Sequence, residues 1–398
     1  RLVQFCKEVW NIPEKETRHA AHLAWEEQRR AKADVRAAGA KALADMEKNG
    51  GSGIVLAGRP YHVDPEINHG IPELIAAYGL TVLTEDCLPI DFVPKRPVRV
   101  NDQWVYHSRL YTAAEFVCGR DDLELIQLNS FGCGLDAVTT DEVCELLEQG
   151  GKLYTCLKID EVNNLGAVRI RIRSLLAAVA MRRERGIHST SHVQPFERVY
   201  YTKEMQKQHY TILAPQMSPI HFDILEPIFR HHGYNFEVLQ NDDRAAIDAG
   251  LKYVNNDACY PSITAVGQLM EAVTSGRYDT DHLALIMSQT GGCCRASNYI
   301  AFIRRALKKA GLEHIPVISL NANGMETNEG FRISPSLLLD AAHGIVLGDL
   351  LMRCLYRVRP YELEKGSANA LHRKWRDICI DSLTSEHPKY RYAQLCRG

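Results

Sequence analysis

The stretch that decides the fold is residues 283–295, which read LALIMSQTGGCCR. Five apolar residues in a row, 283–287, are typical of a strand buried on both faces of a parallel sheet. The Gly291-Gly292 pair that follows breaks the regular structure and permits close approach of the backbone to a bound group. Two adjacent thiols come next. We therefore expect a buried parallel strand whose carboxyl end leads into a cysteine-bearing loop.

Apolar strands alternate with helical patterns on both sides of this stretch. The expected strands are 54–57, 80–84, 123–128 and 152–159, followed by 211–214, 236–240, 283–287 and 316–320. The expected helices are 67–78, 140–149 and 166–185, followed by 222–232, 245–254, 261–275, 298–310 and 334–356. Such alternation predicts an α/β fold with two doubly wound domains, each a parallel sheet with helices on both faces.

Composition marks the domain boundaries. Residues 13–48 are rich in Ala, Glu, Lys and Arg and predict a long solvated helix that ends at the GGSG of residues 50–53. The polar segment 188–207 separates the two runs of strands. We therefore expect an N-terminal helical segment (1–50), a first α/β domain (51–190), a second α/β domain (208–360) and a C-terminal helical tail (361–398).

Length, charge and hydropathy exclude several classes of protein. The 398 residues are 45% hydrophobic, which favours a folded globular chain over disorder, and their formal charge of −2 provides no field to attract nucleic acid or an anionic membrane. No apolar run reaches the length of a membrane span. No secretory signal opens the sequence, so we expect a cytoplasmic protein with free or metal-bound thiols. The first residue is Arg1, which suggests a piece of a longer chain.

Twelve cysteines are the unusual feature of the composition. Several follow strands or lie beside Gly or Pro in loops: Cys87, Cys133, Cys259, Cys293 and Cys294. In open parallel sheets, ligands bind beyond the carboxyl ends of the strands. Thiolates are ligands for zinc, copper(I) and iron–sulfur clusters. There is no C-x-x-C pair of the kind that structural zinc uses and no ferredoxin-type run, so a cluster would be assembled from separated loops.

The alternative for each loop cysteine is a small apolar residue that fills space in the core. Cys118 is an intermediate case, since it closes a helix before Gly119. The other six cysteines fall in helices, in a strand or near the termini, where core packing or exposure is expected: Cys6, Cys144, Cys156, Cys354, Cys379 and Cys396.

Other catalytic signatures are absent from the sequence. There is no phosphate-binding G-x-x-x-x-G-K-[ST] loop, no G-x-G-x-x-G after the first strand and no G-x-S-x-G elbow. His62 could transfer a proton or contact a substrate, and the alternative is a hydrogen-bonded loop histidine. Arg59 and Arg295 could hold an anion such as a coenzyme phosphate, and the alternative is a solvent-facing ion pair.

Four motifs resemble the acyl-CoA dehydratase activase-related family. They are GRPYHVDP (58–65), NSFGCG (129–134), LKIDE (157–161) and QTGGCCRASNY (289–299), and the resemblance covers most of residues 50–360. Long members of this family fuse ATP-hydrolysing activase modules to a region similar to 2-hydroxyacyl-CoA dehydratase subunits and double-cubane cluster proteins.

The resemblance implies flavodoxin-like domains and an iron–sulfur site. A [4Fe-4S] cluster at the domain interface would be held by Cys133, Cys259 and Cys294. Arg59, His62 and Arg295 would lie near an iron that lacks a protein ligand. In a variant, Cys87, Cys118 and Cys293 would extend the ligand set to a double-cubane [8Fe-9S] cluster.

The function implied is that of the iron–sulfur component of an ATP-driven low-potential reductase or a 2-hydroxyacyl-CoA dehydratase-like system. An activase module, on the same longer chain or on a separate subunit, would deliver electrons for the radical dehydration of an acyl-CoA. The alternatives are a non-catalytic electron-relay or scaffold domain of a larger activase, and a zinc-binding interaction domain. A homodimer is left open. No partner nucleic acid or membrane is expected.

Overall fold

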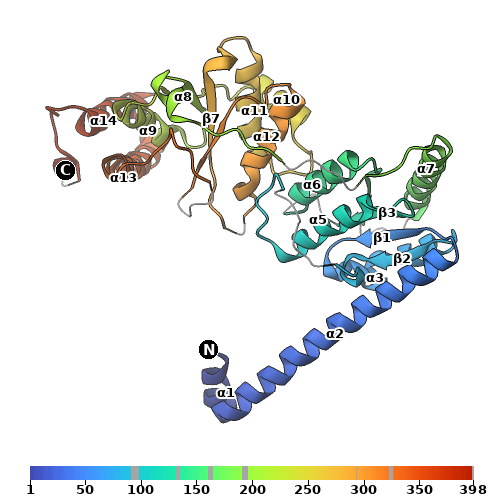
Figure 1. Ribbon diagram of the computed structural model, residues 1–398. Helices are drawn as coiled ribbons and strands as arrows, with labels where there is room; N and C mark the ends of the chain where they lie inside the picture. The colour runs from blue at the N-terminus through green and yellow to red at the C-terminus, as the bar shows by residue number, and fades with distance from the viewer. Residues whose placement is uncertain are drawn as a thin grey trace. The chain divides into compact units, whose positions relative to one another are not determined.

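The computed structural model describes residues 1–90, 98–130, 135–159, 165–190, 196–292, 294–321 and 326–396. The chain forms two compact units, and the main boundary between them lies between Phe196 and Glu197. Each unit contains one parallel four-stranded sheet with helices around it (Figure 1).

The sheet of the first unit has the strand order β2-β1-β3-β4. Its strands are β1 (Gly53–Ala57), β2 (Thr81–Thr84), β3 (Leu123–Asn129) and β4 (Thr155–Lys158), and all of the pairings are parallel. The two central strands, β1 and β3, are buried along their whole length, which explains why they carry runs of apolar residues. After β1 the chain continues to β2 on one side of the sheet, and after β3 it continues to β4 on the other side. The loops that follow β1 and β3 therefore flank the switch point of the sheet, where the strand order reverses.

Helices cover both faces of this sheet. The apolar core on one face joins Ile54 and Ile126 of the strands to Ile75 and Ile172 of the helices α4 and α7. On the other side, α5 contacts β1 and β3. The helices of the unit outside the N-terminal segment are α3 (Pro65–Asn68), α4 (Ile71–Ala76), α5 (Val105–Cys118), α6 (Asp136–Gln149) and α7 (Leu165–Glu184), with the 3₁₀ turns η1 (Pro60–Val63) and η2 (Glu85–Cys87).

The single helix expected over 67–78 is two helices in the structure. His69, with φ of 55°, and Gly70, with φ of 80°, lie in the left-handed region between α3 and α4. The side chain of Asn68 accepts a hydrogen bond from the Gly70 amide at 3.0 Å and supports this turn. The apolar pattern continues through the break, and for that reason the sequence did not reveal it.

The N-terminal segment is helical, as predicted. It comprises α1 (Leu2–Trp10) and α2 (Glu14–Lys48), which Figure 1 draws as a long helix, and most residues of α2 are exposed. Near its carboxyl end, α2 contacts η2 of the first sheet. Gly39 makes this approach possible, because a Cβ atom at Gly39 would lie 1.9 Å from the carbonyl oxygen of Cys87.

The sheet of the second unit repeats the same strand order, β6-β5-β7-β8. Its strands are β5 (Thr211–Ala214), β6 (Phe236–Val238), β7 (Leu283–Ser288) and β8 (Val317–Leu320), again all parallel. In both sheets the second strand lies outside the first, and the third lies on the other side of it, which is the arrangement of the flavodoxin-like fold. The prediction of two doubly wound α/β domains is confirmed.

Alternate residues of these strands face different helix layers. Ile212, Ala284 and Ile286 join a core with Ile224 of α9 and Leu347 of α13. Successive strand residues point to opposite faces, and α12 contacts β7 and β8, so the second layer contains α11 and α12. The helices are α8 (Lys203–Lys207), α9 (Pro219–His231), α10 (Arg244–Tyr253), α11 (Tyr260–Thr274), α12 (Tyr299–Lys309), α13 (Pro335–Val358), α14 (Ser367–Thr384) and α15 (Tyr392–Leu395), with η3 (Thr280–His282), η4 (Arg295–Asn298) and η5 (Arg359–Tyr361).

Among the described residues, no helix is both long enough and apolar enough to cross a membrane.

Candidate functional site

Two of the predicted cysteine ligands occupy equivalent positions in the second unit. Cys259 is the residue that immediately precedes α11, and Cys294 immediately precedes η4, which continues directly into α12. Both residues have extended backbone dihedrals, as N-cap residues do. The first turn of a helix presents amide groups without intrahelical partners and a partial positive charge, and both favour a thiolate.

Hydrogen bonds act directly on the two sulfur atoms. The amide of Ala296 donates to the Sγ of Cys294 at 3.5 Å, and the hydroxyl of Tyr299 lies 2.8 Å from the Sγ of Cys259. Burial by itself would raise the pKa of the Cys259 thiol. Hydrogen bonds from Tyr299, Arg295 and Ser262 outweigh burial and hold this pKa below its ordinary value. These surroundings therefore favour the thiolate of Cys259, the form that binds metals, more than water does.

Tyr299 joins the two cysteines into one site. Burial raises the pKa of Tyr299 above its ordinary value, and the nearby thiols of Cys259 and Cys294 raise it further, whereas Arg295 opposes them. The phenol thus stays protonated, and its hydroxyl is the donor when Cys259 is a thiolate. The site consists of Cys259, Cys294, Arg295 and Tyr299, and we call it the cysteine site.

A buried polar framework holds the loop that carries Cys294. The side chain of Gln289 donates to the carbonyl of Ser297 at 3.0 Å and accepts from the hydroxyl of Ser319 at 2.7 Å. The hydroxyl of Ser297 in turn donates to the carbonyl of Gly292 at 3.1 Å. Gly291 has a φ of 68°, in the region where glycine is favoured. These bonds fix the path of the chain between the end of β7 and η4.

The donor set suits an iron–sulfur cluster in chemical type. Cys259 and Cys294 supply two soft sulfur ligands, and the pKa of Cys259 is held below its ordinary value. Cys133 and Cys293, also predicted as ligands, lie outside the described residues. Within the described ranges, no three side chains of His, Cys, Asp or Glu come together as a metal site. Cys259 and Cys294 are thus the two residues of the described chain that could hold such a group from one side.

Cys87 and Cys118 lie at opposite ends of the strands of the first sheet. Cys87 ends η2 beyond the carboxyl end of β2, and its Sγ lies 3.2 Å from the carbonyl oxygen of Thr84. Burial raises the pKa of Cys87. Cys118 is fully buried at the end of α5, just before β3 begins, with its Sγ 3.5 Å from the carbonyl oxygen of Leu146. This geometry does not support a ligand set that includes both thiols.

His62 is held firmly in the loop that follows β1. It is 2% exposed, and the amide of Arg59 donates to its Nδ1 at 2.9 Å. A neutral imidazole with an acceptor at Nδ1 carries its proton on Nε2. Nε2 lies 3.3 Å from the hydroxyl of Ser130, which is also 2.7 Å from the hydroxyl of Tyr61. In this state His62 donates to Ser130 and does not act as its base. Of the two interpretations of His62 from the sequence, this geometry favours the hydrogen-bonded loop histidine.

Arg295 is the predicted anion-binding residue that the structure brings to the cysteine site. It forms one of the hydrogen bonds that lower the pKa of Cys259. Arg59 and His62 belong to the switch-point loops of the first unit, together with Ser130. Arg295 therefore lies with Cys259 in the second unit, whereas Arg59 and His62 lie together in the first.

Two residues with functional potential were not singled out from the sequence. Tyr299 lies within the QTGGCCRASNY motif, but nothing in that motif shows that its hydroxyl reaches Cys259. Glu85 begins η2 and is 4% exposed, and burial raises its pKa to about 7 despite Arg109, whose Nη2 lies 3.3 Å from its Oε1. Such a carboxyl can exchange protons near neutral pH. No sequence signal indicates this, because the burial arises from the packing of η2 and α5.

Comparison with known proteins gives one match. Residues 1–88 match the family described as CoA enzyme activase uncharacterised domain (DUF2229). No curated protein and no solved structure matches the chain. The matched part runs from α1 to just beyond η2 and ends before β3, although β1 pairs with β3 in the sheet. It relates the amino-terminal part of this chain to an activase family and does not reach the cysteine site.

Proposed function

We propose that this chain is the iron–sulfur component of an ATP-driven low-potential reductase or 2-hydroxyacyl-CoA dehydratase-like system, with a [4Fe-4S] cluster bound at the cysteine site. The observation that carries the proposal is the placement of Cys259 and Cys294 at two helix N-termini, with both thiols near enough to Tyr299 to raise its pKa. Structural cysteines are usually buried and protonated. Here the surroundings of Cys259 favour the thiolate, and Cys294 is exposed.

Each residue of the cysteine site has a distinct task in this proposal. Cys259 and Cys294 hold the group, and Cys133, outside the described residues, is the third ligand that we propose. The cluster supplies one-electron chemistry at low potential. Tyr299 and the amide of Ala296 donate hydrogen bonds to the ligating sulfurs, and Arg295 contributes a positive charge beside them.

The relation of residues 1–88 to a CoA enzyme activase domain supports the choice of electron donor. We propose an ATP-hydrolysing activase module, on the same longer chain or on a separate subunit, in an oxygen-poor cytoplasm. The sequence of this chain contains no phosphate-binding loop of its own, so ATP hydrolysis is assigned to that module. We propose an acyl-CoA as the substrate class, and the relation to a CoA enzyme activase domain supports this choice.

Cysteine variants purified without oxygen test the ligand assignment. Cys259→Ser, Cys294→Ser and Cys133→Ser are each expected to lose most of the bound iron and the electron paramagnetic resonance signal of the reduced cluster. Cys144→Ser is the matched control, because Cys144 lies on α6 with its Sγ 3.3 Å from Glu148 and outside the cysteine site. Full iron content in Cys259→Ser or Cys294→Ser would remove that residue from the ligand set, and equal loss in all four variants would indicate a general effect on folding.

A further inference from the structure

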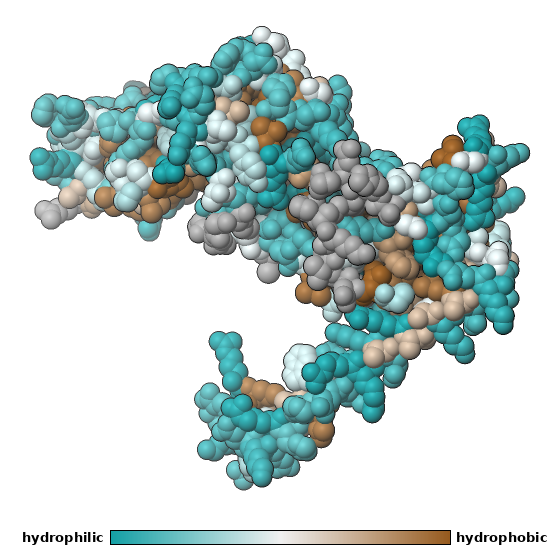
Figure 2. Space-filling model, viewed as in Figure 1, coloured by the Kyte–Doolittle hydropathy of each residue, from teal (hydrophilic) through white to brown (hydrophobic). Residues whose placement is uncertain are grey.

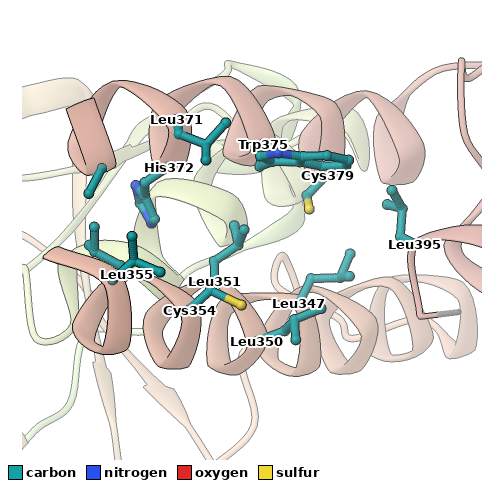
Figure 3. Close-up of a pocket in the computed structure, with 12 residues that line it drawn as sticks. Leu347, Leu350, Leu351, Cys354, Leu355, Leu371, His372, Trp375, Cys379 and Leu395 are labelled. Carbon is teal, nitrogen blue, oxygen red and sulfur yellow. The ribbon is translucent and has the colours of Figure 1, made fainter. Parts of the chain in front are cut away.

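An apolar pocket lies between α13 and α14, in the carboxyl-terminal part of the second unit. Its volume is about 300 Å³, at the lower end of the range for small-molecule sites. Figure 3 shows side chains from the two helices pointing toward each other, with Leu395 at one side. The lining residues on α13 are Leu347, Leu350, Leu351, Cys354, Leu355 and Val358. We call this cavity the interhelix pocket.

The floor and the lip of the interhelix pocket differ in exposure. Leu351 and Cys379 form part of the floor and belong to the core that α9 and α13 build on the sheet. Val358 and Leu371 at the lip are 52% and 53% exposed. Large apolar side chains exposed together around a cavity are uncommon in proteins without a ligand or partner at that place. Figure 2 shows hydrophobic residues gathered on the surface over α13.

No side chain that lines the interhelix pocket is charged at neutral pH. Its one imidazole, His372, has a pKa lowered mainly by burial and additionally by Arg376. A ligand within the pocket therefore meets hydrocarbon, sulfur, the indole of Trp375 and a neutral imidazole. This lining suits an apolar chain and offers no partner for a charged group, which would have to stay at the mouth.

Two cations lie on the helices that line the interhelix pocket. Arg357 follows Cys354 by three positions on α13 and Lys374 follows Leu371 by three positions on α14, so the helical repeat places each beside a lining residue. In the part of the chain that the structure describes, no ion pair involves Arg357 or Lys374. The segment that connects α13 to α14 carries two carboxylates, Glu364 and Glu362, and Glu362 is engaged with the amides of Gly366 and Ala368 at the start of α14.

We propose that the interhelix pocket binds a small amphiphile, with an unbranched acyl chain between α13 and α14 and an anionic head beside Arg357 and Lys374. The volume and apolar lining select the chain, and the cations Arg357 and Lys374 select the sign of the head. Binding would remove the lip residues from water, which is the favourable contribution, and the head would keep its hydration. The cysteine site takes no part in this interaction, so the proposal stands apart from the proposed cluster.

Calorimetric titration of the whole chain tests the proposal with two probes of equal chain length. Sodium decanoate, below its micelle concentration, carries the anionic head, and 1-decanol lacks it. We expect one saturable decanoate site per chain. Arg357→Glu/Lys374→Glu should weaken decanoate binding at least fivefold and leave decanol binding unchanged. Lys203→Glu/Lys207→Glu on α8 makes the same change of charge away from the pocket and is the matched control.

Variants that fill the cavity test its location. Cys354→Trp and, at the exposed lip, Leu350→Trp should each weaken binding of both probes at least tenfold, whereas Leu339→Trp, also exposed on α13 but outside the lining, should not. Circular dichroism confirms that each variant is folded. The proposal is overturned by the absence of saturable decanoate binding, by unchanged affinity in both filling variants, or by equal weakening in the control pair. A dimer in sedimentation velocity that Cys354→Trp dissociates would also overturn it, since a second copy would then cover the groove.

Discussion

The hydroxyl of Tyr299 lies 2.8 Å from the Sγ of Cys259, although 40 positions separate the two residues in the chain. One stands at the start of α12 and the other just before α11, so the contact ties together two helix N-termini on the same layer of the second sheet. A phenol that remains protonated is a permanent hydrogen-bond donor to a thiolate. Substitution of Tyr299 can therefore change the surroundings of the cysteine site without removing either cysteine.

Replacing Tyr299 with Phe should raise the pKa of the Cys259 thiol in iron-free protein. The variant loses a hydrogen bond to the charged form, and because Cys259 is partly exposed the rise is limited to roughly one pH unit. The rate of alkylation of the Cys259 peptide by iodoacetamide, followed by mass spectrometry across pH, measures it. Tyr253→Phe, on α10, is the control. An unchanged alkylation profile in Tyr299→Phe would show that the hydroxyl does not stabilise the thiolate.

Gln289→Leu should loosen the loop that carries Cys294. The substitution leaves the Ser319 hydroxyl and the Ser297 carbonyl without their buried partner and should lower the free energy of unfolding by roughly 2 kcal/mol. Urea unfolding measures the loss, and faster alkylation of Cys294 should accompany it. Gln208→Leu, at an exposed position after α8, should change neither quantity. Wild-type stability in Gln289→Leu would contradict the role given to this framework.

The buried carboxyl of Glu85 predicts a loss of stability as the pH rises. Burial raises its pKa from 4.5 to about 7, so the folded state holds this proton more tightly than the unfolded chain does. The stabilisation from Glu85 is fully present below pH 4.5 and is lost as the pH rises through 7. The difference between the two pKa values corresponds to roughly 3 kcal/mol.

Urea unfolding at pH 5 and pH 8 measures this effect in the wild type and in Glu85→Gln, whose side chain cannot ionise. The decline between the two pH values should be smaller in Glu85→Gln than in the wild type. Glu184→Gln, at the exposed end of α7, should follow the wild type. The same decline in Glu85→Gln and the wild type would mean that Glu85 ionises normally.

Gly39→Ala should destabilise the first unit, contrary to what helix propensity predicts. Alanine is favoured over glycine within an exposed helix by about 1 kcal/mol. At this position, however, the added methyl group would meet the backbone of Cys87 at 1.9 Å, and the resulting displacement of α2 from η2 should cost about 1–3 kcal/mol. Thermal unfolding compares it with Ala38→Gly, an exposed neighbour where only propensity acts. A Gly39→Ala protein more stable than the wild type would contradict the close contact.

Regular structure with a strong pattern could be predicted from the sequence. The apolar runs that became β1, β3, β5 and β7 and the Ala- and Glu-rich helix α2 were recognised, because burial on both faces and continuous solvation leave clear signals. The turn at His69 and Gly70 was missed, since its left-handed backbone depends on a local hydrogen bond from Gly70 to Asn68. That bond has no counterpart in the hydrophobic pattern.

The candidate site could be predicted only in part. Cys259 and Cys294 were selected from their place beside Pro261 and after β7, and the structure places both at helix N-termini. Cys118 was selected because it is a cysteine next to Gly119. Its place at the end of the strands opposite to Cys87 depends on the direction of α5. The protonation of Glu85 and the donor role of Tyr299 arise from tertiary packing, which short sequence motifs do not encode.

The most direct test of the central claim is the iron and acid-labile sulfide content of the chain purified without oxygen. The account predicts four iron atoms and four sulfides per chain, as in a [4Fe-4S] cluster, with the sulfides lost together with the iron on exposure to air. Eight irons per chain would instead indicate the double-cubane group. Fresh, folded protein that contains neither iron nor sulfide, and that takes up neither on anaerobic reconstitution, would contradict the claim.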